Sequence, residues 1–191
     1  MANKFFGHLK TIHTHKHLVF RYCRKSGLFR QGLFHDMSKF SPIEFIPGVR
    51  YFQGNRSPND MQRRKEGYSA AWLNHKGRNR HHLEYWIDYN PEEEGKYAGL
   101  EMPLPYVIES VCDRIAASRI YNGDAYQNSF PLEYYRWTRS HILVHPATDQ
   151  KFLFYLNYLA QNGEDALFKL MREDLAQYKK AKKESLRGTL N

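Results

Sequence analysis

Apolar side chains along most of this chain recur every three or four residues, and this helical period limits the possible folds more than any other feature. Residues 5–25 show the period clearly, because Ile12, Val19 and Cys23 fall on one face of a helix. No stretch of alternating apolar and polar residues is long enough to indicate a sheet. The sequence therefore predicts an all-α protein.

Helix start and stop signals divide the chain into about seven to eight helices. Gly27 is a typical helix stop, and Pro103 is a typical helix start. The stretch SPIE reads as a capping box, in which Ser41 caps a helix and Glu44 reaches back to it. The predicted helices cover residues 5–25, 28–38, 41–51, 58–76, 103–121, 131–143, 148–161 and 164–185. Residues 78–101 are polar and predicted to be irregular.

The length of 191 residues fits a single domain, residues 1–191, in which residues 145–191 form covering helices. No run approaches the roughly 18 apolar residues of a membrane span, so we expect no membrane insertion. The first residues are too polar for a secretory signal. The only two cysteines, Cys23 and Cys112, lie in helical patterns and read as free buried thiols of a reducing compartment. We therefore expect a cytoplasmic protein.

The formal net charge is +9, and much of the excess lies in the run KKAKKESLR at residues 179–187. Such a charge favours anionic partners, and a small anionic substrate such as a nucleotide fits it. Nucleic acid is an open but less favoured partner, because the sequence has no zinc-finger cysteine pattern and no RNA-binding signature. The run itself also fits a solvated helix end. The sequence does not indicate an oligomeric state.

Several of the ten histidines fall on inward faces of the predicted helices. In the run HTHKH, His15 lies on the apolar face of its helix, whereas His13 and His17 lie on the opposite side. His8 also lies on the inner face and is a weaker candidate. His35 and Asp36 follow an apolar run, at the edge of the expected core, where a carboxylate needs a partner or a metal ion.

Further candidates lie later in the chain. His75 shares a helix face with Trp72, and a short glycine-containing turn can return either His81 or His82 to it. Asp113 lies in the middle of an apolar helix, where aspartate is rarely buried without a partner. A salt bridge to Arg114 or Arg119 is the alternative for Asp113. Together these side chains predict a site for one or two divalent transition-metal ions, such as Fe, Mn, Co, Ni or Zn.

The same residues resemble two known families. Three features are similar to the motifs of the HD-domain metallohydrolases. They are HKHLV, with His15 and Val19, then HDMSK, with His35, Asp36 and Lys39, and finally the later Asp113. More narrowly, nearly the whole chain resembles DUF5662, a bacterial family of unknown function. The resemblance is carried by the blocks HDMSKFSP, HKGRNRHHLEYW and MPLPYVIESVCDRIAAS. In most HD proteins the two histidine motifs are further apart, so here the first two helices must pack tightly.

The HD resemblance implies an HD-like helical bundle and a metal-dependent phosphohydrolase acting through a metal-activated water. His15, His35, Asp36 and Asp113 would bind metal, and His75 with His81 or His82 would complete a two-ion site. Asp36 would bridge two ions or orient the water. Lys39 and Arg78, with Arg80 and Arg114, could neutralise phosphoryl oxygens, although surface salt bridges are equally consistent with the sequence.

Two other classes of protein remain open from the sequence. A few HD-like proteins use a similar di-iron site to activate oxygen, so the chain could be an oxygenase or oxidoreductase with the same ligands. A non-catalytic binding protein with a vestigial metal site is the third alternative.

Overall fold

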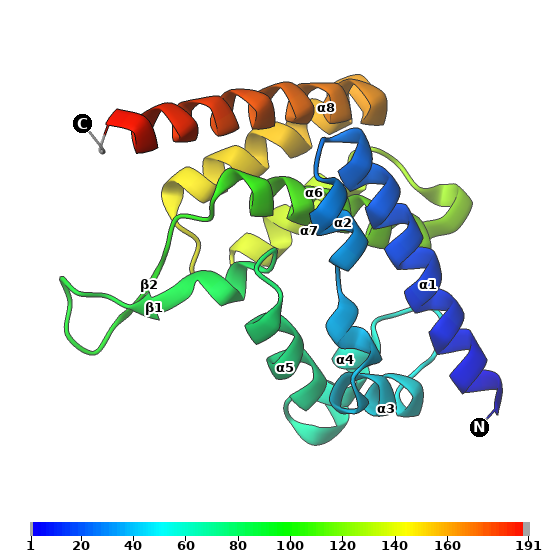
Figure 1. Cartoon of the computed structure of the whole chain (residues 1–191). Helices are drawn as coiled ribbons and strands as arrows, with labels where there is room; N and C mark the ends of the chain where they lie inside the picture. Colours follow the sequence, from blue (N-terminus) through cyan, green and yellow to red (C-terminus); the bar gives the residue numbers. More distant parts are fainter. Residues whose placement is uncertain (1, 189–191) are drawn as a thin grey trace.

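The computed structural model describes residues 2–188 and confirms the all-α class (Figure 1). Its α-helices are α1 (Ala2–Lys25), α2 (Phe29–Phe34), α3 (Pro42–Arg50), α4 (Pro58–Glu66), α5 (Ala70–Arg78), α6 (Leu104–Asn122), α7 (Phe130–Arg139) and α8 (Pro146–Gly188). Three short 3-10 turns are η1 (Met37–Phe40), η2 (Leu83–Trp86) and η3 (Gly123–Ala125), and two short strands are β1 (Ile87–Tyr89) and β2 (Tyr97–Gly99).

Helix α6 lies at the centre of the structure, between α1 and α8 (Figure 1). Apolar side chains surround most of its circumference, and six of them are fully buried, as expected of a helix covered on several sides. These are Val107, Ile108, Val111, Cys112, Ile115 and Ala116. Both cysteines, Cys23 of α1 and Cys112, are buried and free, as predicted. This packing holds α6, which carries Asp113, against α1, which carries His15.

Helices α1 and α2 approach each other closely at Gly32. A Cβ atom on Gly32 would lie only 2.6 Å from the Cβ atom of Cys23 and 3.3 Å from the backbone of Phe20. Only a residue without a side chain fits this contact. The tight packing predicted for the first two helices is therefore present.

Two predicted helices end earlier than the sequence indicated. The helix predicted over residues 28–38 ends at Phe34, because Asp36 adopts a left-handed backbone conformation. The helix predicted over residues 58–76 is divided into α4 and α5, because Gly67 has a φ of 82° and ends α4. Ser69 then starts α5 by accepting a hydrogen bond from the Trp72 amide.

The predicted capping box at the start of α3 is only partly present. Ser41 occupies the N-cap position and Pro42 the first turn, but the Ser41 side chain makes no capping hydrogen bond. The Glu44 side chain does not reach back either. It is buried and bonds to Asn74 and His75 of α5, so the interior of the protein competes successfully for this carboxylate.

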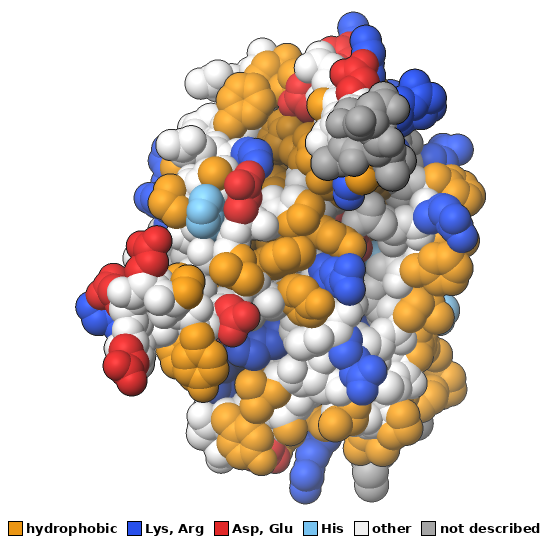
Figure 2. Space-filling view, turned by 60° about the vertical axis from the view of Figure 1, so that its left-hand side comes forward, with side chains coloured by type: hydrophobic (Ala, Val, Ile, Leu, Met, Phe, Trp, Pro, Cys, Tyr) orange, Lys and Arg blue, Asp and Glu red, His pale blue; other side chains and the backbone are white. Residues whose placement is uncertain are grey.

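The segment predicted to be irregular contains a small antiparallel hairpin, in which Ile87 pairs with Gly99 and Tyr89 with Tyr97. The hairpin projects from the body, and acidic side chains gather at its tip, on the left of Figure 2. Lysine and arginine side chains are scattered among apolar and polar ones on the face shown there. That face has no continuous basic track of the kind that follows a nucleic-acid backbone.

Helix α8 packs against α6, α7 and α1. Covering helices were predicted over residues 145–191, of which residues 189–191 lie outside the described part. Helix α8 has a kink at Gly163, whose φ is 81°, so its two halves correspond to the two helices predicted there. Helix α7 ends at Arg139, earlier than predicted. Among residues 2–188, no helix is both long and apolar enough to cross a bilayer.

Candidate metal centre

A sharp turn after α2 brings two adjacent site residues into the interior. His35 is extended, and Asp36 has φ 53° and ψ 31°. Within residues 2–188, Asp36 is the only residue other than glycine with a positive φ. Such conformations are uncommon outside glycine and concentrate at functional sites. Lys16 of α1 donates a hydrogen bond to the His35 carbonyl oxygen and holds the turn against the first helix.

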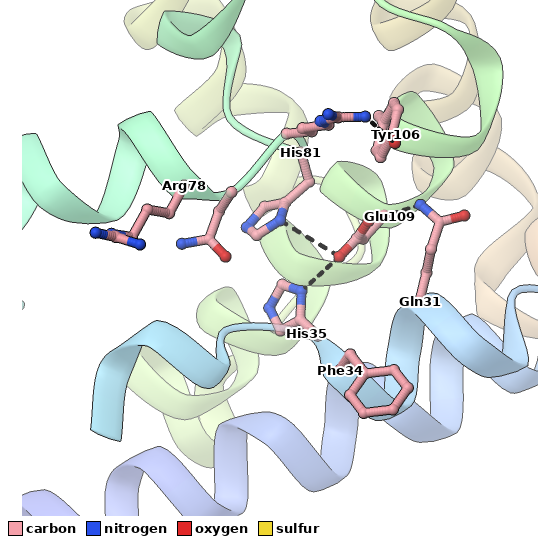
Figure 3. Close-up of a pocket in the computed structure, with 9 residues that line it drawn as sticks. Gln31, Phe34, His35, Arg78, His81, Tyr106 and Glu109 are labelled. Atoms are coloured by element: carbon pink, nitrogen blue, oxygen red, sulfur yellow. Dashed lines mark hydrogen bonds and ion pairs between the residues drawn. The ribbon is translucent and has the colours of Figure 1, made fainter. Parts of the chain in front are cut away.

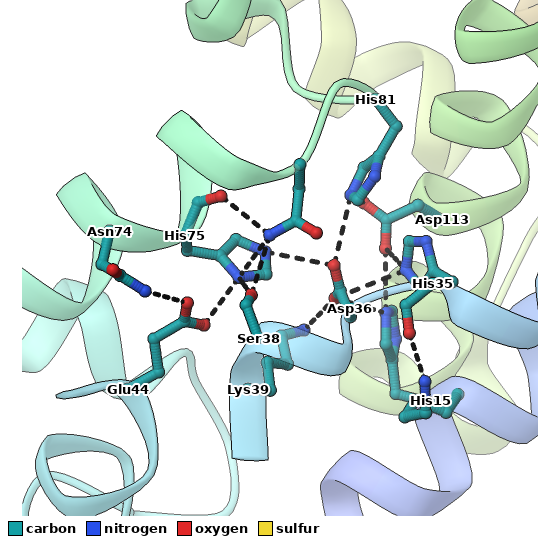
Figure 4. A network of polar contacts seen from close by, with 12 residues as sticks. His15, His35, Asp36, Ser38, Lys39, Glu44, Asn74, His75, His81 and Asp113 are labelled. Atoms are coloured by element: carbon teal, nitrogen blue, oxygen red, sulfur yellow. Dashed lines mark hydrogen bonds and ion pairs between the residues drawn. The ribbon is translucent and has the colours of Figure 1, made fainter. Parts of the chain in front are cut away.

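A first group of four ligands comes from α1, this turn and α6, and consists of His15, His35, Asp36 and Asp113 (Figure 4). The Nε2 atom of His15 lies 2.9 Å from Oδ1 of Asp113 and 3.8 Å from Oδ2 of Asp36. The Nε2 atom of His35 lies 3.3 Å from Oδ2 of Asp36. Two ligands of one ion lie at most about 4.2 Å apart, because each is about 2.1 Å from it. The group therefore has the dimensions of a cation site.

A second group lies on the other side of Asp36 and consists of His75, His81, His82 and Asp36 itself. The Nε2 atoms of His75 and His81 lie 3.3 and 3.4 Å from Oδ1 of Asp36. The sequence left a choice between His81 and His82, and the structure brings both rings together, 4.1 Å apart at their centroids. Each oxygen of Asp36 thus faces a different set of imidazoles.

The polar atoms that point into these two groups are buried but make no hydrogen bond within residues 2–188. They are Nε2 of His15, His35, His81 and His82 and both carboxylate oxygens of Asp36. The closest opposite charge is the Lys39 ammonium, 2.6 Å from Oδ2 of Asp36. Oδ2 of Asp36 and Nε2 of His15 thus have charged neighbours, whereas buried polar atoms without any partner cost free energy unless they bind something. The donor set of imidazole nitrogens and carboxylate oxygens fits divalent transition metals.

Two further carboxylates hold the outer ring nitrogens of the histidines. Oε1 of Glu109 lies 3.0 Å from Nδ1 of His35 and 3.3 Å from Nδ1 of His81. Oε2 of Glu44 lies 2.8 Å from Nδ1 of His75. A carboxylate on one ring nitrogen keeps the proton there and leaves the other nitrogen free to bind a metal. The atoms of His35, His81 and Glu109 also lie close enough together to form a ligand group, but these contacts already satisfy them.

These outer carboxylates were not among the predicted site residues. Glu109 lies one turn before Asp113, on the same side of α6. Its position in a buried apolar stretch was the available signal, because glutamate is rarely buried without a partner. Glu44 gave no such signal, because its spacing from Ser41 also fits a cap.

The cluster carries excess negative charge. Four carboxylates, of Asp36, Asp113, Glu109 and Glu44, surround the histidines, and one ammonium, that of Lys39, opposes them. Burial alone would favour neutral carboxyls.

The pKa values show how the carboxylates stay charged despite burial. Contacts with His35 and His81 outweigh burial at Glu109 and lower its pKa to about 2. Neighbouring His35, Lys39 and His75 likewise outweigh burial at Asp36 and lower its pKa well below the usual range. Burial opposes charge on His35 too, but Asp36, Asp113 and Glu109 outweigh it and raise its pKa well above the usual value. A proton on His35 thus supplies positive charge that a metal ion could supply instead.

The predicted cationic residues lie in different surroundings. Lys39 contacts Asp36 directly. Arg78 is exposed, donates to Asn74 and points away from the imidazoles, although it lines the same cavity of about 230 Å³ as His35 and His81 (Figure 3). Arg80 lines this cavity too, with its guanidinium near the Tyr106 hydroxyl.

The other predicted residues are not part of the ion groups. The Arg114 guanidinium packs against aromatic rings of α7 and α8, and Arg119 pairs with Glu164, so neither forms the alternative salt bridge with Asp113. His13 and His17 are exposed, as predicted. His8 is buried between Phe45 and Phe52, outside both ligand groups.

Comparison with known proteins places the chain in a family but gives no function. No curated protein and no solved structure was found to match it. One family model matches residues 4–157, a range that includes every residue of both ligand groups. Its description is a family of unknown function. The chain therefore belongs to the DUF5662 family.

Proposed function

We propose that this protein is a metal-dependent hydrolase of small anionic substrates, with phosphate esters or nucleotides as the favoured class. The observation that carries the proposal is the convergence of buried imidazole nitrogens and carboxylate oxygens on both sides of Asp36, at distances that fit cation sites. His15, His35, Asp36 and Asp113 would hold one ion, and Asp36, His75, His81 and His82 a second. The motif similarity to HD-domain metallohydrolases supports the same chemistry, because the residues of those motifs meet in one cluster.

Bound divalent ions would supply a water of lowered pKa and polarise the substrate's oxygens. The chain's own residues would do the rest. Asp36 would present one oxygen to each ion and fix their separation. Asp113 and Lys39 are partly exposed, with side-chain exposures of 16% and 28%, so substrate would approach beside them. The Lys39 ammonium would then neutralise charge on an anionic substrate.

Elemental analysis of protein purified without added metal tests the proposal. We expect at least one transition-metal ion per chain in the wild type, and none in His35→Ala or Asp36→Ala. His17→Ala is the matched control, because His17 lies on the same helix as His15 but is exposed. This control should keep the metal.

The same preparations distinguish hydrolysis from the alternatives. Hydrolysis of p-nitrophenyl phosphate or bis-p-nitrophenyl phosphate by the metal-loaded protein, lost in Asp36→Ala, would support the proposal. Two irons with oxygen-dependent turnover would instead favour an oxygenase. A wild type without metal, whose melting temperature no divalent ion raises, would overturn both enzymatic assignments and favour a non-catalytic protein.

A further inference from the structure

One outer carboxylate contacts a histidine from each ligand group. Oε1 of Glu109 accepts from Nδ1 of His35 at 3.0 Å and lies 3.3 Å from Nδ1 of His81 (Figure 3). His35 belongs to the first group and His81 to the second. The two rings are tilted by 38° to each other, with centroids 4.4 Å apart, and the same carboxylate oxygen lies at the Nδ1 edge of both. Any change at Glu109 therefore reaches both groups.

The Glu109 side chain is held firmly in this position. Its second oxygen, Oε2, accepts a hydrogen bond of 2.8 Å from the Gln31 side chain of α2. Only 8% of the Glu109 side chain is exposed, so little solvent competes for its two oxygens. An ionised carboxylate is the acceptor that most increases the basicity of a metal-binding imidazole.

The other outer carboxylate contacts one group only. Glu44 bonds to His75 of the second group and to the side-chain amide of Asn74, and neither residue belongs to the first group. The protein therefore contains a natural comparison between two buried glutamates. One is shared between the groups and the other belongs to one of them.

We propose that Glu109 is a positioning residue that couples the two ion groups, so that its charge sets the affinity of both. The inference rests on the proposed ion binding. By orienting His35 and His81 together, Glu109 directs both Nε2 atoms toward Asp36, whose two oxygens face the two groups. Asp36 links the groups from the inside, and Glu109 links them from the outside.

Titration of the metal-free protein with Co²⁺, followed by ligand-field absorption, measures the two affinities. Loss of an outer partner typically costs 10–100-fold in metal affinity. We expect Glu109→Gln to weaken both equivalents of Co²⁺ by about 10–100-fold. Glu44→Gln should weaken one equivalent by a similar factor and leave the other unchanged. Glu92→Gln, at the exposed tip of the hairpin, is the control and should change neither.

A spectroscopic measurement separates coupling from a general loss of structure. With Mn²⁺ at a concentration that fills both sites of the wild type, electron paramagnetic resonance should show a spin-coupled pair. At the same Mn²⁺ concentration, chosen just high enough to fill both wild-type sites, Glu44→Gln should show the signal of single ions, whereas Glu109→Gln should leave most of the Mn²⁺ unbound. Circular dichroism of each metal-free variant monitors folding.

Gln31→Met provides a second test if Glu109→Gln does not fold. It removes the hydrogen bond to Oε2 but keeps the Glu109 charge. We therefore expect a smaller loss of Co²⁺ affinity, equal for both equivalents. Loss of one equivalent only, or of neither, in a folded Glu109 or Gln31 variant overturns the coupling while leaving the proposed function intact. A wild type that binds no Co²⁺ or Mn²⁺ refutes the proposed function itself.

Discussion

His8 is buried but lies outside both ligand groups, and acidification should reveal that its role is structural. Its ring lies against Gly48, where a Cβ atom would approach within 2.1 Å of Nε2, and its Nδ1 has no hydrogen-bond partner within the described residues. Burial and the nearby Lys39 ammonium lower the pKa of His8 from 6.5 to about 4. The folded protein therefore holds His8 neutral, whereas the unfolded chain protonates it below about pH 6.5.

The sign and size of the effect follow from this difference. Between pH 6.5 and 4 the unfolded state binds more protons, so the free energy of unfolding decreases as the pH falls through this window. One pKa unit corresponds to about 1.4 kcal/mol, so His8 should cost about 2 kcal/mol at pH 5 and about 3 kcal/mol below pH 4. The contribution is absent above neutral pH.

Urea denaturation of the metal-free wild type and of His8→Gln, at pH 7 and pH 5, measures this contribution. Other groups titrate in both proteins, so only the difference between the two decreases is assigned to His8. Between pH 7 and pH 5, we expect the free energy of unfolding to fall by about 2 kcal/mol less in the variant than in the wild type. It should also keep the metal content of the wild type, because His8 lies outside both ligand groups. Equal losses in both proteins, or loss of metal from the variant, would refute the assignment.

Two further predictions concern the backbone that supports the site. Gly32→Val should lower the free energy of unfolding by about 1–3 kcal/mol in urea denaturation, because the valine side chain would meet Cys23 where α2 crosses α1. Unchanged stability would show that the two helices can separate freely. Gly163→Ala should cost about 1–3 kcal/mol, because φ 81° and ψ 176° are strained for any residue with a side chain. A melting temperature equal to that of the wild type would show that the kink of α8 can straighten.

Local patterns in the sequence were sufficient to predict the helices and the inward direction of most ligands. His15 and Asp113 lie on helices that form nearly as predicted, and His75 lies on the second half of a predicted helix that Gly67 divides; all three side chains reach the cluster. Helical periodicity depends only on neighbouring residues, so it can be read from the chain directly. The pairing of these faces around a common point was an expectation from the motif set alone.

The tertiary structure decided how those side chains meet. The left-handed turn at Asp36 directs its two oxygens to opposite groups, and the segment after α5 brings both His81 and His82 to one side of it. Glu44 follows a cap-like spacing in the sequence yet bonds to a histidine 31 residues away. Contacts of this kind depend on how distant helices pack and on which buried groups need partners. That balance of burial and charge is settled only when the whole chain has folded.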